Sequence, residues 1–442
     1  EWMLALRDTA SVDSAGSGNG NFSSLRDAIN AVDVTIADAY AFGQNAKDVN
    51  VQIASEAQYW KLSLASATVE GEVQVPYAND VPLEVNLSHL VFPAAEEPES
   101  SASSFDLAWV GPPPAEDAYW LEQDRVDILA DVDPREFPYM NFQAADVRRG
   151  EAEYGSWQFT IEPNESGAVF SKLLVDTRGV RAGKEGEEGR FMWTYDGKVH
   201  HSYFSSILEA GNLATVLSNF GYAPSLESTS AEFHTSVDWN GSPAFFAVES
   251  LSGDVDLKVL EGRFLQSNAG AANGALKLIS IINFDALVRR LRFSDDLLRS
   301  GLSYEQINGA LKINDGIVDI VDRLQIIGPA SLFQVSGQLD LAQQTIDGSL
   351  YITLPLSDNI PWMSGIAVLN NLINWQVAVG VFLFDQIFGE QVDSLTSAQY
   401  TLKGPWASLE PRLNQVFGTP GAPAAPPGAS VTPSANGATV PA

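Results

Sequence analysis

The chain of 442 residues contains no cysteine and only four histidines. The missing thiols exclude disulfide bonds, thiolate metal sites and cysteine nucleophiles. His200 and His201 are adjacent, so on a strand their rings would point to opposite faces and could not share a metal ion. Zinc-protease spacing, a Walker loop, a dinucleotide fingerprint and a Gly-x-Ser-x-Gly elbow are also absent. We therefore expect no metal, no cofactor and no enzymatic activity.

Basic residues are scarce as well. There are 25 lysines and arginines against 56 aspartates and glutamates, which gives a net charge of −31. Phosphate-backbone binding needs a basic surface, so nucleic acid is excluded as a partner. The acidity predicts a solvated face that keeps the protein soluble.

Three aspartates lie close together within the acidic region. Asp127, Asp131 and Asp133 alternate with apolar residues in a candidate strand. We interpret them as the wet face of that strand, in preference to a cation site.

The chain begins at Glu1, and no charged-then-apolar leader follows. We expect a processed protein or an excised fragment whose membrane anchor lies upstream.

Alternation of apolar and polar residues is the main structural signal, and it predicts antiparallel strands with one apolar face. Turn residues such as Asp196-Gly197 and Asp315-Gly316 separate the strands. The residues predicted to form the apolar faces are Trp60, Leu62, Leu64, Trp157, Phe159, Ile161, Val255, Leu257, Val259, Leu350, Ile352 and Leu354.

Helical spacing is limited to a few segments, namely residues 206–220 and 273–292. The segments rich in Pro, Ser and Glu near 93–114, and in Pro, Ala and Gly at 418–442, are expected to be unstructured. The predicted organisation is a β segment (1–201), a helical insert (202–224), a second β segment (225–356), an apolar helical segment (357–395), a closing strand (396–417) and a disordered tail (418–442).

Each apolar strand face must be covered. Two sheets could cover each other as a sandwich, which is the commoner solution. Alternatively, one sheet could curl into an open groove whose interior is covered by acyl chains.

A basic cluster stands out in this acidic chain. Arg289, Arg290 and Arg292 lie beside a candidate hydrophobic helix. Arginine forks match phosphate oxygens, which makes these residues candidates for a lipid head group. Ordinary helix-end arginines are the alternative.

Residues 359–384 carry no formal charge. The segment is long enough to span a bilayer, but Asn and Gln side chains interrupt its middle. We predict short helices that lie on a membrane surface, or a buried helical cap on the sheet. The candidate membrane-contact residues are Trp362, Met363, Leu369, Ile373, Trp375, Phe382 and Phe384.

The order of short motifs over roughly residues 30 to 412 resembles the YhdP family of AsmA-like proteins, specifically its C-terminal region. The motifs are VPLEVNLSHL at 81–90, VDPREFP at 132–138, GSW at 155–157, GRFMW at 189–193, VDWNGSP at 237–243, LSGDVDL at 251–257, INF at 282–284, RRL at 289–291, GLSY at 301–304, VSGQLDL at 335–341 and YTLKGPW at 400–406.

This resemblance implies a mainly β fold: an elongated, curled, largely antiparallel sheet that forms an apolar groove, with a few short helices. It also implies a periplasmic protein that moves phospholipid between the inner and outer membranes. Its C-terminal end would meet the inner leaflet of the outer membrane, and a missing N-terminal anchor would hold it in the inner membrane.

Two other functions remain open at this stage. One is a periplasmic assembly factor for outer-membrane proteins that binds strands at its sheet edges. The other is an enzyme acting on envelope polymers. Unknown envelope proteins are possible further partners.

Overall fold

The computed structural model describes residues 31–41, 44–78, 80–92, 127, 129–150, 152–220, 224–265, 303–329, 331–355, 395–405, 409 and 411–417. These residues form one sheet of 19 strands, one α-helix and three 3-10 turns. The strands are β1 (Ala31–Ala41), β2 (Gln44–Ser55), β3 (Tyr59–Ala65), β4 (Val69–Pro76), β5 (Leu83–Phe92), β6 (Met140–Arg149), β7 (Ala152–Asn164), β8 (Gly167–Thr177), β9 (Val180–Ala182), β10 (Gly189–Tyr195), β11 (His200–Ala210), β12 (Leu226–Asn240), β13 (Ser252–Phe264), β14 (Ser303–Asn314), β15 (Ile317–Gly328), β16 (Ser331–Asp340), β17 (Thr345–Pro355), β18 (Leu395–Pro405) and β19 (Arg412–Phe417). The others are α3 (Leu213–Asn219), η3 (Pro134–Glu136), η4 (Pro243–Phe245) and η5 (Val248–Ser250). The predicted mainly β fold is confirmed.

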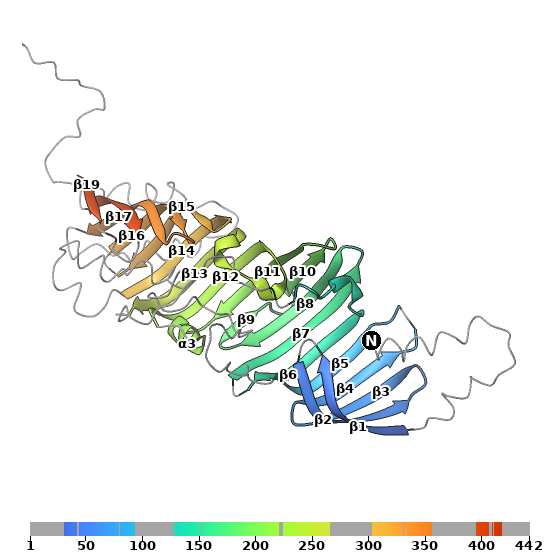
Figure 1. Cartoon of the computed structure of the whole chain (residues 1–442). Coiled ribbons are helices and arrows are strands. Elements are labelled where there is room, and N and C mark those ends of the chain that lie inside the picture. The colour runs from blue at the N-terminus through green and yellow to red at the C-terminus, as the bar shows by residue number, and fades with distance from the viewer. Residues whose placement is uncertain are drawn as a thin grey trace, which may run out of the picture.

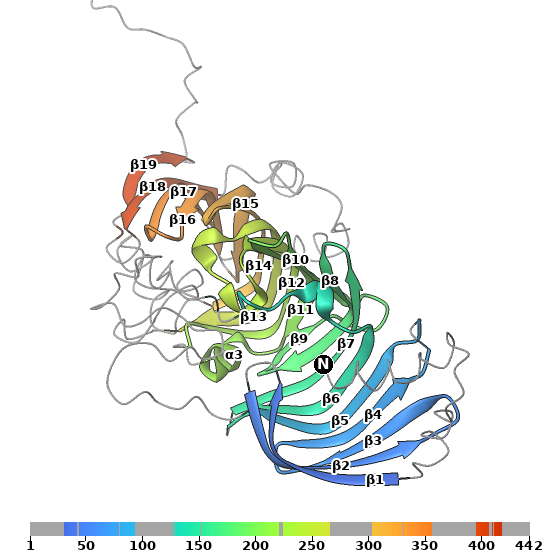
Figure 2. The same cartoon turned by 45° about the vertical axis from the view of Figure 1, so that its right-hand side comes forward.

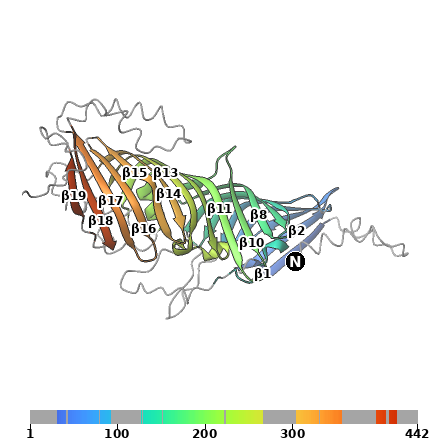
Figure 3. The ribbon, with the colours of Figure 1, turned by 90° about the horizontal axis from the view of Figure 1, so that it is seen from above.

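Strands that follow one another in sequence are neighbours in the sheet, and almost all of them pair antiparallel. They succeed one another from β1 to β19 along an elongated, twisted ribbon (Figures 1 and 3). The exceptions are β5 and β6, which pair in parallel, and β9 and β10, which both lie between β8 and β11. The described strands therefore form a single curled sheet (Figure 2), and the two-sheet sandwich is wrong for them.

The strand connections alternate between the two long edges of this sheet. At one edge, here called the turn edge, short loops join β7 to β8, β10 to β11, β14 to β15 and β16 to β17. At the other, here called the insert edge, α3 joins β11 to β12, and residues 266–302 and 356–394 join β13 to β14 and β17 to β18. The segments that hold the predicted arginine cluster and the uncharged run are thus attached at the same edge.

Two glycines show how the sequence permits the curl. Gly253 in β13 and Gly337 in β16 have φ values of 132° and 126°, which side chains rarely adopt. A Cβ on Gly337 would lie 2.3 Å from the backbone oxygen of Asp347, and one on Gly253 would lie 2.1 Å from that of Ser236. Glycine inside a strand commonly marks such a bend or close backbone approach.

Helix α3 is shorter than the sequence pattern predicts. Residues 206–210 belong to β11 and pair with β12, so the helix begins only at Leu213. The Asn212 side chain caps it by accepting a hydrogen bond from the Ala214 amide at 2.9 Å. Tertiary strand pairing overrides the helical spacing here.

The strand predicted around Asp127, Asp131 and Asp133 is wrong. The described residues form turns followed by η3. Asp127 accepts from the Leu129 amide at 3.0 Å, and Asp133 accepts from the Arg135 amide at 2.9 Å. Short aspartates favour such local turn and cap bonds, which compete with strand pairing.

Candidate functional site: the apolar face of the sheet

The strand registers place apolar side chains on one continuous face of the sheet. Leu62 lies opposite Ile53 and Val73 on its two neighbouring strands. Through Val85, the same face reaches Phe142 and Phe159. It continues through the cross-strand pairs Phe170–Phe191, Phe191–Phe204, Phe204–Val237, Val259–Ile307, Ile307–Ile326, Ile326–Phe333 and Phe333–Ile352.

The residues predicted from alternation lie on this apolar face in two environments. Trp60, Leu62, Ile161, Val259, Leu350 and Ile352 are buried, and Leu62 and Leu350 have no exposed surface at all. Leu64, Trp157, Phe159, Val255 and Leu257 are half-buried. The side chain of Leu354 lies outside the described residues. Only the half-buried group presents apolar surface that a ligand can reach.

A row of aromatic rings crosses the middle of the apolar face. Phe142 and Phe159 stack with centroids 4.8 Å apart. Phe170 then meets Phe159 at 5.6 Å and Phe191 at 5.6 Å, and Trp239 meets Phe191 at 6.0 Å. Aromatic pairs in such geometries add stability beyond their buried area. Of this aromatic row, only Phe159 was predicted as part of the apolar face, because the strand register that brings the other rings beside it is not visible in the sequence.

A strap formed by Asp127 and residues 129–137 closes the turn edge beside the aromatic row. Its Phe137 ring packs on Phe170 and Trp193 at 6.3 and 5.7 Å. The Asp127 carboxylate accepts from the amide and the hydroxyl of Ser242, at 2.9 and 2.5 Å. His200 is hydrogen-bonded to the Ala130 carbonyl oxygen at 2.9 Å. The strap is thus fixed to β10, β11 and the end of β12.

The segment with η4 and η5 continues this wall along the turn edge. Phe246 packs against Trp239 with centroids 5.1 Å apart. The Gly316 amide donates to the Leu251 carbonyl oxygen, and the Leu341 amide donates to that of Gly316, both at 3.0 Å. The apolar face is therefore bounded by chain at the turn edge from β8 to β16.

Two buried tyrosines belong to the apolar cluster of the sheet. Burial raises the pKa of Tyr304 and of Tyr400 above the ordinary value for a phenol. Tyr400 lies opposite Leu350, and Tyr304 packs against Phe264 with centroids 5.5 Å apart. In the strap, by contrast, hydrogen bonds from Arg135 hold the pKa of Asp133 below its usual value.

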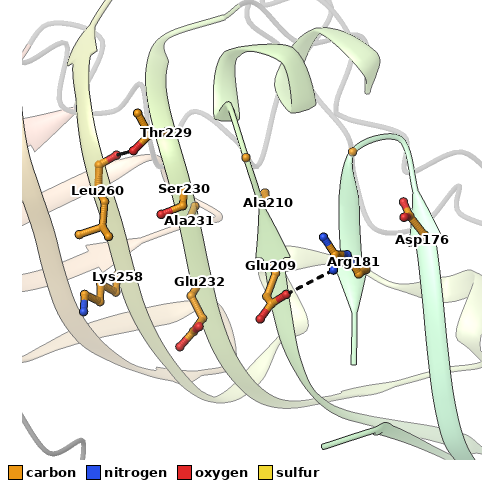
Figure 4. A pocket seen from close by; sticks show the side chains of 12 residues that line it. Asp176, Arg181, Glu209, Ala210, Thr229, Ser230, Ala231, Glu232, Lys258 and Leu260 are labelled. Carbon is orange, nitrogen blue, oxygen red and sulfur yellow. Dashed lines mark hydrogen bonds and ion pairs between the residues drawn. The ribbon is translucent and has the colours of Figure 1, made fainter. Parts of the chain in front are cut away.

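The opposite face of the sheet is polar. Near the insert edge it carries a hollow of about 620 Å³. Asp176, Arg181, Glu209, Glu232 and Lys258 project from successive strands into it (Figure 4). Arg181 and Glu209 form an ion pair at 3.9 Å. Among the described residues, no group of three or more His, Asp or Glu side chains is arranged to hold a metal ion.

Several predicted site residues lie outside the described residues. These are the head-group candidates Arg289, Arg290 and Arg292, and all the membrane-contact candidates between 362 and 384. No helix in the described part of the chain is long and apolar enough to cross a membrane.

Comparison with known proteins identifies a family and a relative. A family model described as YhdP protein matches residues 2–408. The intermembrane phospholipid transporter YhdP of Escherichia coli (strain K12) is 22% identical over 248 residues, which are 56% of this chain and 18% of that protein. The matched part of the chain thus spans less than a fifth of this relative's length. No solved structure matches.

Proposed function

Because the chain belongs to the YhdP family, whose model covers residues 2–408, we propose that it conducts phospholipid between the two membranes of a Gram-negative envelope. The acyl chains lie along the apolar face, and the head groups remain near water. The observation that carries this proposal is the unbroken apolar face from β2 to β18, with half-buried aromatic side chains along its middle.

The driving force for lipid entry is burial of acyl methylenes, about 0.8 kcal/mol for each CH₂ group. No chemical step is required. Apolar side chains repeat from strand to strand along the face, so an acyl chain makes similar contacts at each position. We therefore expect weak selectivity among lipids. The relative from Escherichia coli is named as an intermembrane phospholipid transporter, which supports phospholipid as the cargo.

The proposal extends to location. The chain lies in the periplasm, residues 359–384 contact the outer membrane, and an upstream segment anchors the protein in the inner membrane. Acyl chains contact the half-buried residues of the apolar face, among them Leu64, Trp157, Phe159, Val255 and Leu257. The fully buried residues of that face pack beneath and support them.

Site-specific photo-crosslinking tests the proposal. A benzophenone amino acid replaces Phe159 on the apolar face or, as a matched control, the exposed Gln158 beside it on the other face. A second pair is Phe191 and the exposed Arg190. After irradiation in cells, mass spectrometry should find phospholipid adducts at 159 and 191 and not at 158 or 190.

Two results would overturn the proposal. Equal lipid labelling at 158 and 159 would show that the apolar face does not select acyl chains. Protein adducts without lipid would favour an assembly factor for outer-membrane proteins.

A further inference from the structure

Arg178 occupies an unusual place for a charged residue. It lies in the turn between β8 and β9, and its guanidinium stands 4.2 Å from the Tyr154 ring centroid and 5.4 Å from that of Phe220. Tyr154 packs against the apolar cluster of Leu87, Ala144 and Val147. The guanidinium therefore lies on the same side of the sheet as the apolar face, at the margin of that face.

The backbone of this turn is firmly positioned. Arg178 and Gly179 both have positive φ values, 49° and 89°, as in the tight turns that suit antiparallel hairpins. The Asn219 side-chain amide donates to the Arg178 carbonyl oxygen at 3.0 Å. Helix α3 thus fixes the turn, and the aromatic rings orient the side chain.

Among the described residues, Arg178 has no carboxylate partner. Other arginines near the insert edge have one: Arg148 pairs with Asp146 at 2.8 Å, Arg181 with Glu209 at 3.9 Å and Arg263 with Glu227 at 2.7 Å. Arg178 forms no ion pair with any carboxylate of the described residues. An arginine that pairs with none of the described carboxylates and is stacked on aromatic rings is available to an external anion.

The position matches where a head group must emerge. The strap and the η4–η5 segment wall the turn edge, so a lipid lying on the apolar face between β8 and β12 directs its polar end towards the insert edge. Arg178 lies at that edge. Its planar fork suits two oxygens of a phosphate.

We propose that Arg178 binds the phosphate of a phospholipid whose acyl chains lie on the apolar face, with Tyr154 and Phe220 holding the guanidinium in place. This inference rests on the proposed lipid conduction and adds to it a fixed head-group contact. The contact is to the phosphate, which phospholipids share, so it does not require a particular polar group beyond it.

The test compares lipids with and without a phosphate. Purified full-length chain is loaded from vesicles of phosphatidylglycerol or with diacylglycerol, and the retained lipid is measured by mass spectrometry. Arg178→Gln should retain roughly tenfold less phosphatidylglycerol, as expected for loss of a charge-assisted contact, and unchanged diacylglycerol. Arg178→Lys keeps the charge and loses the fork, so it should be intermediate. Arg263→Gln at the same edge should match the parent.

The possible failures are distinguishable. If the parent chain crosslinks phospholipid at position 159 and Arg178→Gln retains phosphatidylglycerol like the parent, the head-group site is wrong and lipid conduction stands. If the parent crosslinks no lipid, the proposed function fails first. Equal loss of both lipids in Arg178→Gln would also overturn the site. Protection of Arg178 from phenylglyoxal by inorganic phosphate but not by phosphatidylglycerol vesicles would assign it to free phosphate and overturn the lipid contact.

Discussion

The indole Nε1 of Trp193 donates a hydrogen bond to Nδ1 of His200, 3.0 Å away and buried. Because an indole N–H can only donate, the imidazole proton sits on Nε2 and is donated to the carbonyl oxygen of Ala130. His200 is thus a neutral link between the sheet and the strap. His201 beside it is exposed on the other face, as the sequence predicts.

Replacing His200 by alanine should loosen the strap. The change leaves the buried Trp193 N–H without its acceptor, which costs roughly 1–3 kcal/mol of unfolding free energy. Urea denaturation should show this loss, and limited proteolysis should cut faster within residues 129–137. His201→Ala is the matched control and should stay within about 0.5 kcal/mol of the parent. Equal effects of the two variants would contradict the link.

Tyr304 predicts a loss of stability at alkaline pH. Its hydroxyl donates to the Glu227 carbonyl oxygen, and burial raises the pKa of the phenol above its ordinary value of about 10. The unfolded tyrosine therefore loses its proton at a lower pH than the folded one. Stability from Tyr304 is fully present below about pH 10 and falls as the pH rises towards the folded-state pKa.

The variant Tyr304→Phe removes both the hydrogen bond and this titration. It should be less stable than the parent at neutral pH, and its stability should fall less steeply above about pH 10. Chemical denaturation at a series of pH values measures both quantities. Parallel pH profiles for parent and variant would rule out a role for this phenol.

Gly337 should tolerate no side chain. At φ 126°, a Cβ would lie 2.3 Å from the Asp347 backbone oxygen, so β16 or β17 would have to shift. We expect Gly337→Ala to destabilise the protein by at least about 2–3 kcal/mol. Gly211→Ala is the control, because nothing lies within 4 Å of its Cβ position. Thermal unfolding of the two variants measures the difference, and similar melting temperatures would contradict the argument.

The strands and turns were predictable because alternation and turn chemistry are local signals. Trp60, Leu62 and Leu64 show their common face within five residues, and Asp315-Gly316 marks its turn through two positive φ values. The start of helix α3 was less predictable. Ser206 to Ala210 have helical spacing, but they pair with β12, and no local sequence pattern predicts that pairing.

The sequence predicts that the functional surface is an apolar strand face, but it only partly predicts which residues of that face a ligand can contact. Alternation shows that Leu62 and Leu350 lie on an apolar strand face. It cannot show that both are fully buried while Phe159 is half-buried and accessible to a ligand. Whether a residue of the apolar face is buried or accessible depends on which side chains pack over it. Arg178 carries no sequence signal, since its contact with Tyr154, and its lack of an ion pair within the described part of the chain, depend on the fold.

The sharpest test of conduction is a charge placed on the half-buried part of the apolar face. Leu257 lies opposite Phe233 on β12 and Gly309 on β14, and its side chain is half-buried. A carboxylate there would have to be desolvated by each passing acyl chain, which is costly.

Leu260, three residues along β13, faces the polar hollow (Figure 4). The same substitution at Leu260 meets water and other charged groups. Leu257→Asp should therefore strongly reduce phospholipid transfer between donor and acceptor vesicles, while Leu260→Asp transfers like the parent. Circular dichroism should show both variants folded, because neither side chain is fully buried. If Leu257→Asp is folded and transfers lipid at the parent rate, acyl chains do not pass over β13, and conduction along the apolar face is wrong.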